Sequence, residues 1–86
     1  MQMVLTLGAV IRLKRTERGW TQQDLAKEVN VSQVTINKIE RDRSVPRSQT
    51  LEKIEKVLGT NGELREILWE EGRLYAYGMD APDAER

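Results

Sequence analysis

Side chains able to hydrogen-bond to the edges of DNA bases gather in one short stretch, directly after Ser32. They are Gln33, Val34, Asn37 and Lys38. A Gln pairs with adenine through two hydrogen bonds, a Lys donates to guanine acceptors or a phosphate, an Asn does either, and a Val packs on a thymine methyl group. In a helix these positions are left on the outer side. The stretch therefore predicts a helix that reads bases.

Groups suited to the DNA backbone surround this stretch. They are Gln22, Ser32, Arg41, Arg43 and Arg47. The first would stand at a helix N-terminus, whose free backbone N–H groups favour a phosphate, and Ser32 would cap a helix while touching the backbone. The three arginines flank a loop and are candidate phosphate clamps, with a plain surface position as the alternative for Arg43 and Arg47.

Arg15 and Glu40 form a candidate structural ion pair. A carboxylate at the end of a helix is unfavourable beside the negative end of the helix dipole. An arginine from a neighbouring helix would remove that penalty. We expect a partly buried Arg15–Glu40 bridge that fixes the angle of the base-reading helix, against the alternative of two independent surface charges.

Apolar spacing and capping residues predict the elements that position these groups. Five helices are expected, over about residues 7–18, from residue 22, from residue 33, over about 49–58 and from about residue 63. The expected N-caps are Thr6, Thr21, Ser32 and Ser48, and Thr21 forms a weak capping box with Asp24. The expected helix ends are Gly19, Asn30 and Gly59.

The second and third of these helices have the spacing of a helix-turn-helix. Ala26 follows Gln22 by four residues, and Asn30 follows Ala26 by four. The small Ala26 leaves room for two helices to cross closely, and Asn30 tolerates the left-handed conformation of the turn. A unit of this kind can place its second helix in the major groove of DNA.

The composition restricts the classes of function. The net charge is zero, yet residues 1–47 carry nine basic and five acidic groups, whereas residues 48–86 carry five basic and nine acidic. This asymmetry is compatible with a basic DNA-facing part and an acidic opposite end, or with a mixed solvated surface. The chain has no Cys and no His, so we expect no metal, no cofactor and no enzyme activity. No segment has the apolar length of a membrane span or of a signal peptide. A cytoplasmic, nucleoid-associated protein is the expectation.

Residues 19–26 (GWTQQDLA) and 31–41 (VSQVTINKIER) resemble the Xre family, the Cro/C1-type helix-turn-helix regulators of bacteria and phages. Residues 50–59 (TLEKIEKVLG) look like the fourth helix of that family. The resemblance covers about residues 5–70. It implies an all-α, five-helix, lambda-repressor-like bundle that binds double-stranded operator DNA as a dimer. It also implies a phosphate contact for Gln22, and it supports the Arg15–Glu40 pair. This sequence departs from the family where Asn30 and Asp42 replace glycines.

The C-terminal part offers surface for a protein partner. Leu68, Trp69, Leu74 and Tyr75 are candidates for a homodimer interface, since aromatic residues are enriched in interfaces; the alternative is that Trp69 only covers the core. We expect a DNA-binding domain over residues 1–79 and a disordered tail over 80–86. The predicted function is a sequence-specific transcriptional regulator, a repressor on a (pseudo)palindromic operator. The alternative is an antitoxin or anti-regulator of the same fold that binds a protein partner and regulates its own operon.

Overall fold

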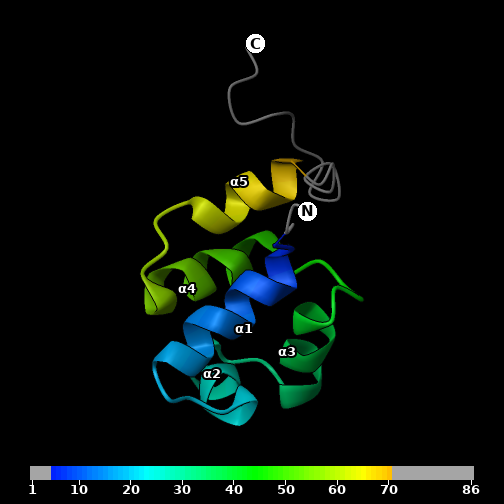
Figure 1. Ribbon diagram of the computed structural model, residues 1–86. Helices are drawn as coiled ribbons and strands as arrows, with labels where there is room; N and C mark the ends of the chain where they lie inside the picture. The colour runs from blue at the N-terminus through cyan, green and yellow to red at the C-terminus, as the bar shows by residue number, and fades with distance from the viewer. Residues whose placement is uncertain (1–4, 71–86) are drawn as a thin grey trace.

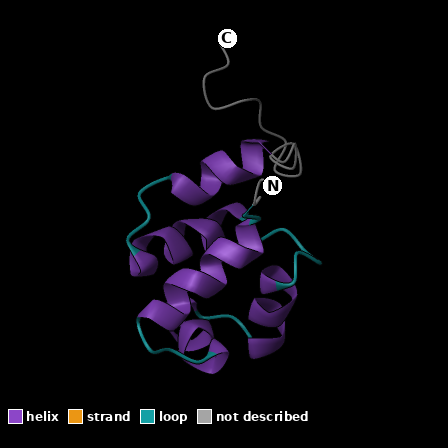
Figure 2. Cartoon of the chain, viewed as in Figure 1, coloured by secondary structure: helices purple, strands orange, loops and turns teal. Residues whose placement is uncertain are grey.

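The computed structural model describes residues 5–70, and these form five helices joined by short turns (Figures 1 and 2). The helices are α1 (Leu7–Glu17), α2 (Gln22–Val29), α3 (Gln33–Glu40), α4 (Ser48–Leu58) and α5 (Glu63–Glu70). No strand occurs within this part of the chain. The prediction of an all-α bundle containing a helix-turn-helix is confirmed. The proposed division at residue 79 and the tail over 80–86 lie outside the described residues.

The first three helices begin at the predicted caps. The side chains of Thr6, Thr21 and Ser32 each accept a hydrogen bond from the backbone N–H three residues ahead. At α2 the capping box is complete, because the Asp24 carboxylate also accepts from the Thr21 N–H at 2.8 Å. These bonds satisfy N–H groups that have no partner inside the helix. The start of each helix is therefore determined by its local sequence.

The prediction of Ser48 as the cap of α4 is wrong. The N-cap is Arg47, and its side chain makes no capping hydrogen bond. The Leu51 N–H donates to the Arg47 carbonyl at 2.8 Å. This bond closes the first helical turn one residue earlier than predicted and makes Ser48 the first residue inside the helix.

The core lies at the centre of the bundle and draws apolar side chains from every helix. Its buried members are Leu7, Val10, Ile11, Leu25, Ala26, Val29, Ile36, Ile39, Leu51, Ile54, Leu58, Leu64 and Leu68. α1 approaches α3 so closely that a Cβ atom on Gly8 would lie 2.4 Å from the Glu40 carbonyl oxygen. Glycine at position 8 therefore permits the crossing on which the orientation of α3 depends.

α5 packs on α1 and α4, at the end of the molecule opposite α2 (Figure 1). Its start is held by a carboxylate from the preceding helix. Glu55 accepts hydrogen bonds from the Thr60 hydroxyl, the Gly62 N–H at 2.8 Å and the Arg65 N–H at 3.2 Å. Within residues 5–70, none of the helices has the length and apolar character needed to cross a membrane.

Candidate nucleic-acid interface

The outer face of α3 carries most of the residues predicted to read bases. Gln33, Val34 and Lys38 are exposed, and Asn37 is half-buried. Val34 keeps 62% of its surface accessible, the largest exposed fraction among the large hydrophobic side chains of residues 5–70. Ile36 and Ile39 point the other way and are fully buried in the core. The helix therefore has one anchored face and one face open to a ligand.

The turn between α2 and α3 has the geometry that its sequence predicts. Asn30 adopts the left-handed conformation, with φ 61° and ψ 49°. The Val31 N–H donates to the Ala26 carbonyl at 3.0 Å and closes the turn. Ala26 is buried at the crossing of the two helices. A side chain larger than alanine there would meet the tightly packed interior.

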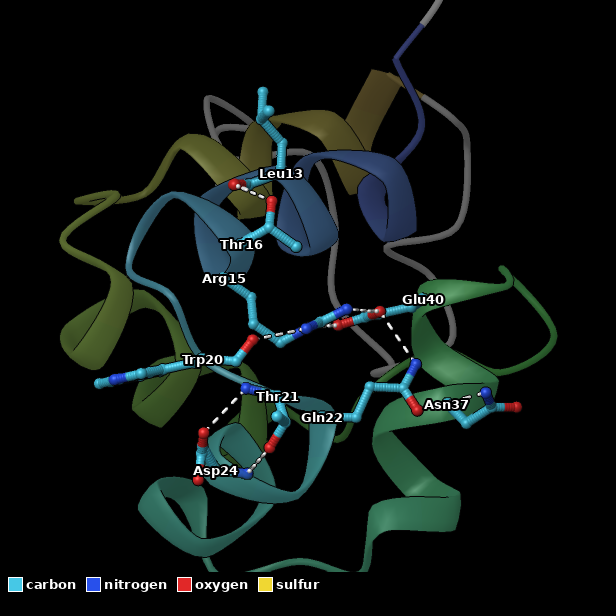
Figure 3. A network of polar contacts seen from close by, with 9 residues as sticks. All are labelled: Leu13, Arg15, Thr16, Trp20, Thr21, Gln22, Asp24, Asn37 and Glu40. Carbon is cyan, nitrogen blue, oxygen red and sulfur yellow. Dashed lines mark hydrogen bonds and ion pairs between the residues drawn. The ribbon is translucent and has the colours of Figure 1, made fainter.

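Arg15 of α1 and Glu40 of α3 form a buried ion pair (Figure 3). Arg15 Nε donates to Glu40 Oε2 at 2.6 Å, and Arg15 Nη2 donates to Glu40 Oε1 at 3.0 Å. The Arg15 Nη1 atom donates to the Trp20 carbonyl at 2.7 Å. Each residue of the pair retains only 8% of its surface exposed. This paired, two-point geometry fixes α3 against α1 in direction as well as in distance.

Two of the predicted DNA-contacting side chains extend from this ion pair. Gln22 Nε2 donates to Glu40 Oε1 at 3.1 Å, and Asn37 Nδ2 donates to Gln22 Oε1 at 3.4 Å. Figure 3 shows the Asn37 side-chain oxygen on the side away from Gln22. The amide groups at the start of α2 and in the middle of α3 are thus oriented by hydrogen bonds that lead back to the buried pair.

The residues predicted to hold phosphates lie near both ends of α3. Gln22 opens α2, the exposed Ser32 caps α3, and Arg41 follows the last residue of α3. Arg43 and Arg47 are exposed in the connection to α4. Arg47 also lines a groove of about 510 Å³ together with Thr35 of α3 and Lys53 of α4. The set therefore surrounds the outer face of α3 with hydrogen-bond donors and positive charge.

Asp42 takes a role that the sequence did not reveal. Its carboxylate accepts from the Thr6 hydroxyl at 2.6 Å and from the Gly8 N–H at 3.0 Å, so it satisfies the start of α1 from the far end of α3. Its φ of 59° is left-handed, a conformation that Asp tolerates better than most residues. Asp42, which replaces the glycine usual in the family, thus keeps the left-handed turn after α3 and adds hydrogen bonds that join this turn to the start of α1.

Arg12 was also missed as a candidate. It lies on α1 and lines a groove with residues of α2 and α3, among them Gln22 and Asn37. The available signal was its helical spacing, because Arg12 precedes Arg15 by three residues and so lies on the same face of α1.

One carboxyl group near the interface titrates differently from a free one. The hydrogen bonds from the Thr21 backbone and hydroxyl lower the pKa of Asp24 below its ordinary value, with a smaller contribution from the charge of Lys27. Asp24 therefore stays ionised at neutral pH and keeps the start of α2 capped.

The candidate dimer residues are placed differently from one another. Leu68 is fully buried in the core of its own chain, whereas Trp69 keeps 45% of its surface exposed. Leu74 and Tyr75 lie outside the described residues. Of the four, Trp69 is the one that offers described surface to another molecule.

Comparison with known proteins gives a family and several partial relatives. A family model described as "Helix-turn-helix" matches residues 11–64. Endothelial differentiation-related factor 1 of Homo sapiens is 38% identical over 58 residues, which is 67% of this chain and 39% of that protein. Multiprotein-bridging factor 1 of Debaryomyces hansenii is 40% identical over 55 residues, and that of Eremothecium gossypii is 39% identical over 54. These matches cover 64% and 63% of this chain, but only 37% and 36% of the two fungal proteins. No solved structure matched the chain.

Proposed function

This chain belongs to the Xre (Cro/C1) type of the helix-turn-helix family and is a DNA-binding regulator, and from that premise we propose that it represses transcription at a sequence-specific operator. Its operator is a (pseudo)palindrome bound by a dimer. In this proposal Gln33, Val34, Asn37 and Lys38 read bases. The phosphate contacts come from Gln22, Ser32, Arg41, Arg43 and Arg47.

The observation that carries the proposal is the immobilised, outward-facing α3. The buried Arg15–Glu40 pair fixes the helix, and the exposed Val34 gives it an apolar contact suited to a thymine methyl group. Preorganisation of this kind lowers the ordering cost of binding. A helix that served only to cover the core would gain nothing from an exposed valine and directed amide groups.

Selection of bound sites from random duplex DNA tests the proposal. A recurrent half-site repeated about one helical turn away is expected for a dimer. Gln33→Ala should then cost about 1–3 kcal/mol and relax the preference at one position, whereas Arg43→Ala should weaken all sequences alike. Recovery of no preferred sequence would refute sequence-specific regulation. Identical behaviour of the two variants on selected and random DNA would refute the assigned roles.

The dimer is proposed to form at the α5 end of the molecule, with Leu74 and Tyr75 joining Trp69. A two-fold arrangement would set two copies of α3 roughly 34 Å apart. Analytical ultracentrifugation with and without operator DNA measures the assembly. A monomer at high micromolar concentration in both conditions would contradict the dimer.

A second candidate function is the binding of a protein partner by the same domain. Two observations favour it. Some relatives are named multiprotein-bridging factors. Three large apolar side chains are also exposed: Leu5 just before α1, Leu13 on α1 and Trp69 on α5. An antitoxin or anti-regulator that also binds its own operon is one form of this function. Co-purification of a second protein that Trp69→Ser releases, without loss of DNA binding, is the expected result. Co-purification unchanged by this substitution would contradict a partner site at Trp69.

A further inference from the structure

A groove of about 280 Å³ lies where α1, α2 and α3 meet, and its lining is almost entirely polar. The residues that line it are Arg12, Arg15, Gln22, Asn37, Glu40 and Arg41. Four of them, Gln22, Asn37, Glu40 and Arg41, come from the helix-turn-helix, and Arg12 and Arg15 come from α1. We propose that this groove binds one phosphate group of the DNA backbone, with Arg12 of α1 as a contact residue from outside the motif. This inference rests on the proposed DNA-binding function.

The charge of the groove favours an anion. Arg15 and Glu40 neutralise each other at 2.6 Å and form a buried floor. Arg12 and Arg41 are exposed, and within residues 5–70 neither side chain takes part in an ion pair. The groove therefore keeps the positive charge of two guanidinium groups beside a neutral, rigid floor. Guanidinium groups bind phosphate oxygens through paired hydrogen bonds.

The amide groups supply further donors. A Gln side chain has two N–H donors, and Gln22 uses one of them on Glu40 at 3.1 Å. Asn37 likewise uses one N–H on Gln22 at 3.4 Å. Each amide keeps a second N–H for a ligand in the groove. A phosphate has several acceptor oxygens, and it can receive these N–H groups together with the two arginines.

The position of the groove identifies the phosphate as one belonging to duplex DNA. Arg41, the C-cap of α3, lies one helical turn after Asn37, and both residues line the groove. A phosphate bound there would lie directly beside the outer face of α3. A helix lying in the major groove has the DNA backbone along its flanks. Arg12 would thus fix the register of α3 on the DNA from the side of α1.

The test compares two charge-removing substitutions of equal chemistry, Arg12→Gln and Arg18→Gln. Arg18 is exposed like Arg12, but its guanidinium group lies over the Trp20 ring, 5.6 Å from the ring centre. Figure 3 shows Trp20 on the far side of the ion pair from Asn37. Affinity for the selected operator and for a random duplex is measured against salt concentration. Arg12→Gln should weaken both by about fivefold and reduce the slope of log K against log salt by about one. Arg18→Gln should keep the wild-type slope. Far-UV circular dichroism checks that both variants fold.

An unchanged slope in Arg12→Gln, or an equal change in Arg18→Gln, would overturn the inference. Failure of this inference can be told apart from failure of the proposed function. If the protein had no sequence preference, the salt dependence of its affinity for random DNA could still be measured for each variant. Inorganic phosphate, titrated at constant ionic strength while the Arg12 and Arg41 side-chain NMR signals are recorded, separates the two sources of the ligand. Signal shifts together with an unchanged DNA slope would assign the groove to a free anion and overturn the DNA assignment. A reduced slope supports it, with or without those shifts.

Discussion

Within residues 5–70, α3 and α5 each span eight residues and pack on the same core, but they are held by different forces. α3 is held by polar bonds whose direction is fixed, made across the chain to α1 and α2. α5 is held by apolar burial and by one carboxylate from the adjacent helix. In the proposed function, the helix that presents side chains to DNA is the one bonded to two other helices through directed side-chain contacts.

The polar attachment of α3 is concentrated at its C-terminal end. Glu40, the last residue of α3, binds Arg15 and Gln22. Beyond its C-terminal end, Asp42 binds the Thr6 hydroxyl and the Gly8 N–H. Each bond joins residues at least 18 positions apart in the sequence. α3 therefore cannot rotate against α1 without breaking several of them together.

The attachment of α5 described above is mainly apolar. Leu64 and Leu68 are fully buried against α1 and α4, and hydrophobic burial is non-directional. The Glu55 bonds fix only the start of α5. The comparison teaches that stability and orientation can be changed separately in this protein, and the substitutions below are chosen to do so.

The largest effect is expected for Glu40→Ala. It leaves the Arg15 charge buried without its partner, and breaking a buried pair costs about 3–5 kcal/mol. This is comparable with the whole stability of a domain of this size. We expect a protein largely unfolded at 25 °C by circular dichroism and chemical denaturation. A well-folded Glu40→Ala protein would show that the pair does not hold α3.

Replacing both partners separates orientation from stability. Arg15→Met with Glu40→Leu removes the buried charges and fills the space, a change that is often neutral for stability. Gln22 would then lose its acceptor, and α3 would lose the directed bonds made through Glu40, whereas the Asp42 bonds to Thr6 and Gly8 would remain. We expect a folded protein with DNA affinity reduced about tenfold, measured by fluorescence anisotropy. Wild-type DNA affinity in this double variant would show that the directed bonds of Glu40 do not orient α3 for binding, and the contrast drawn between α3 and α5 would be wrong.

Leu68→Ala is the corresponding test of α5. Removing a fully buried leucine side chain should cost about 3 kcal/mol of unfolding free energy, measured by urea denaturation. After correction for the unfolded fraction, the affinity for a single DNA half-site should equal that of the wild type. A reduced intrinsic affinity would show that α5 also orients α3.

Local features of the sequence sufficed to predict most of the fold. The caps at Thr6, Thr21 and Ser32 and the left-handed Asn30 act within a few residues, so their patterns are legible without knowledge of the packing. The error at Ser48 has the same local origin, since two adjacent residues competed to begin α4. The Arg15–Glu40 contact was inferable because a carboxylate ending a helix requires compensation.

The parts that escaped prediction depend on distant contacts. Asp42 joins residues 34 and 36 positions away, and no local pattern encodes that distance. Arg12 acquires its surroundings only when α1 crosses α3 at Gly8. Its three-residue spacing from Arg15 indicates a face of α1, but not the residues of α2 and α3 that line the groove with it. The sequence thus proposed the candidate DNA contacts of the helix-turn-helix and the Arg15–Glu40 pair, but it did not propose Arg12 of α1.

Glu55→Ala tests the local clamp of α5 and should have a smaller effect. It removes the acceptor shared by the Thr60 hydroxyl and the backbone of Gly62 and Arg65, and loss of a helix cap costs about 1 kcal/mol. Amide hydrogen exchange should quicken in α5 and remain unchanged in α3. Glu52→Ala is the control, because Glu52 lies at an exposed position of α4, the helix that also carries Glu55. Equal quickening in α3 would show that the two attachments are coupled.

The smallest effect concerns Asp24 and the pH dependence of stability. Hydrogen bonds from Thr21 lower the pKa of the Asp24 carboxyl in the folded state. Its stabilising effect is therefore complete above the unfolded pKa, near 4, and is lost as pH falls through the lower folded pKa. Wild type should exceed Asp24→Asn in melting temperature at about pH 7, and the difference should shrink toward about pH 2. A difference independent of pH would mean that the cap at α2 acts through shape alone. The cap lies at the start of α2, next to Gln22. Its loss should therefore loosen the turn between α1 and α2 before it weakens the Arg15–Glu40 pair.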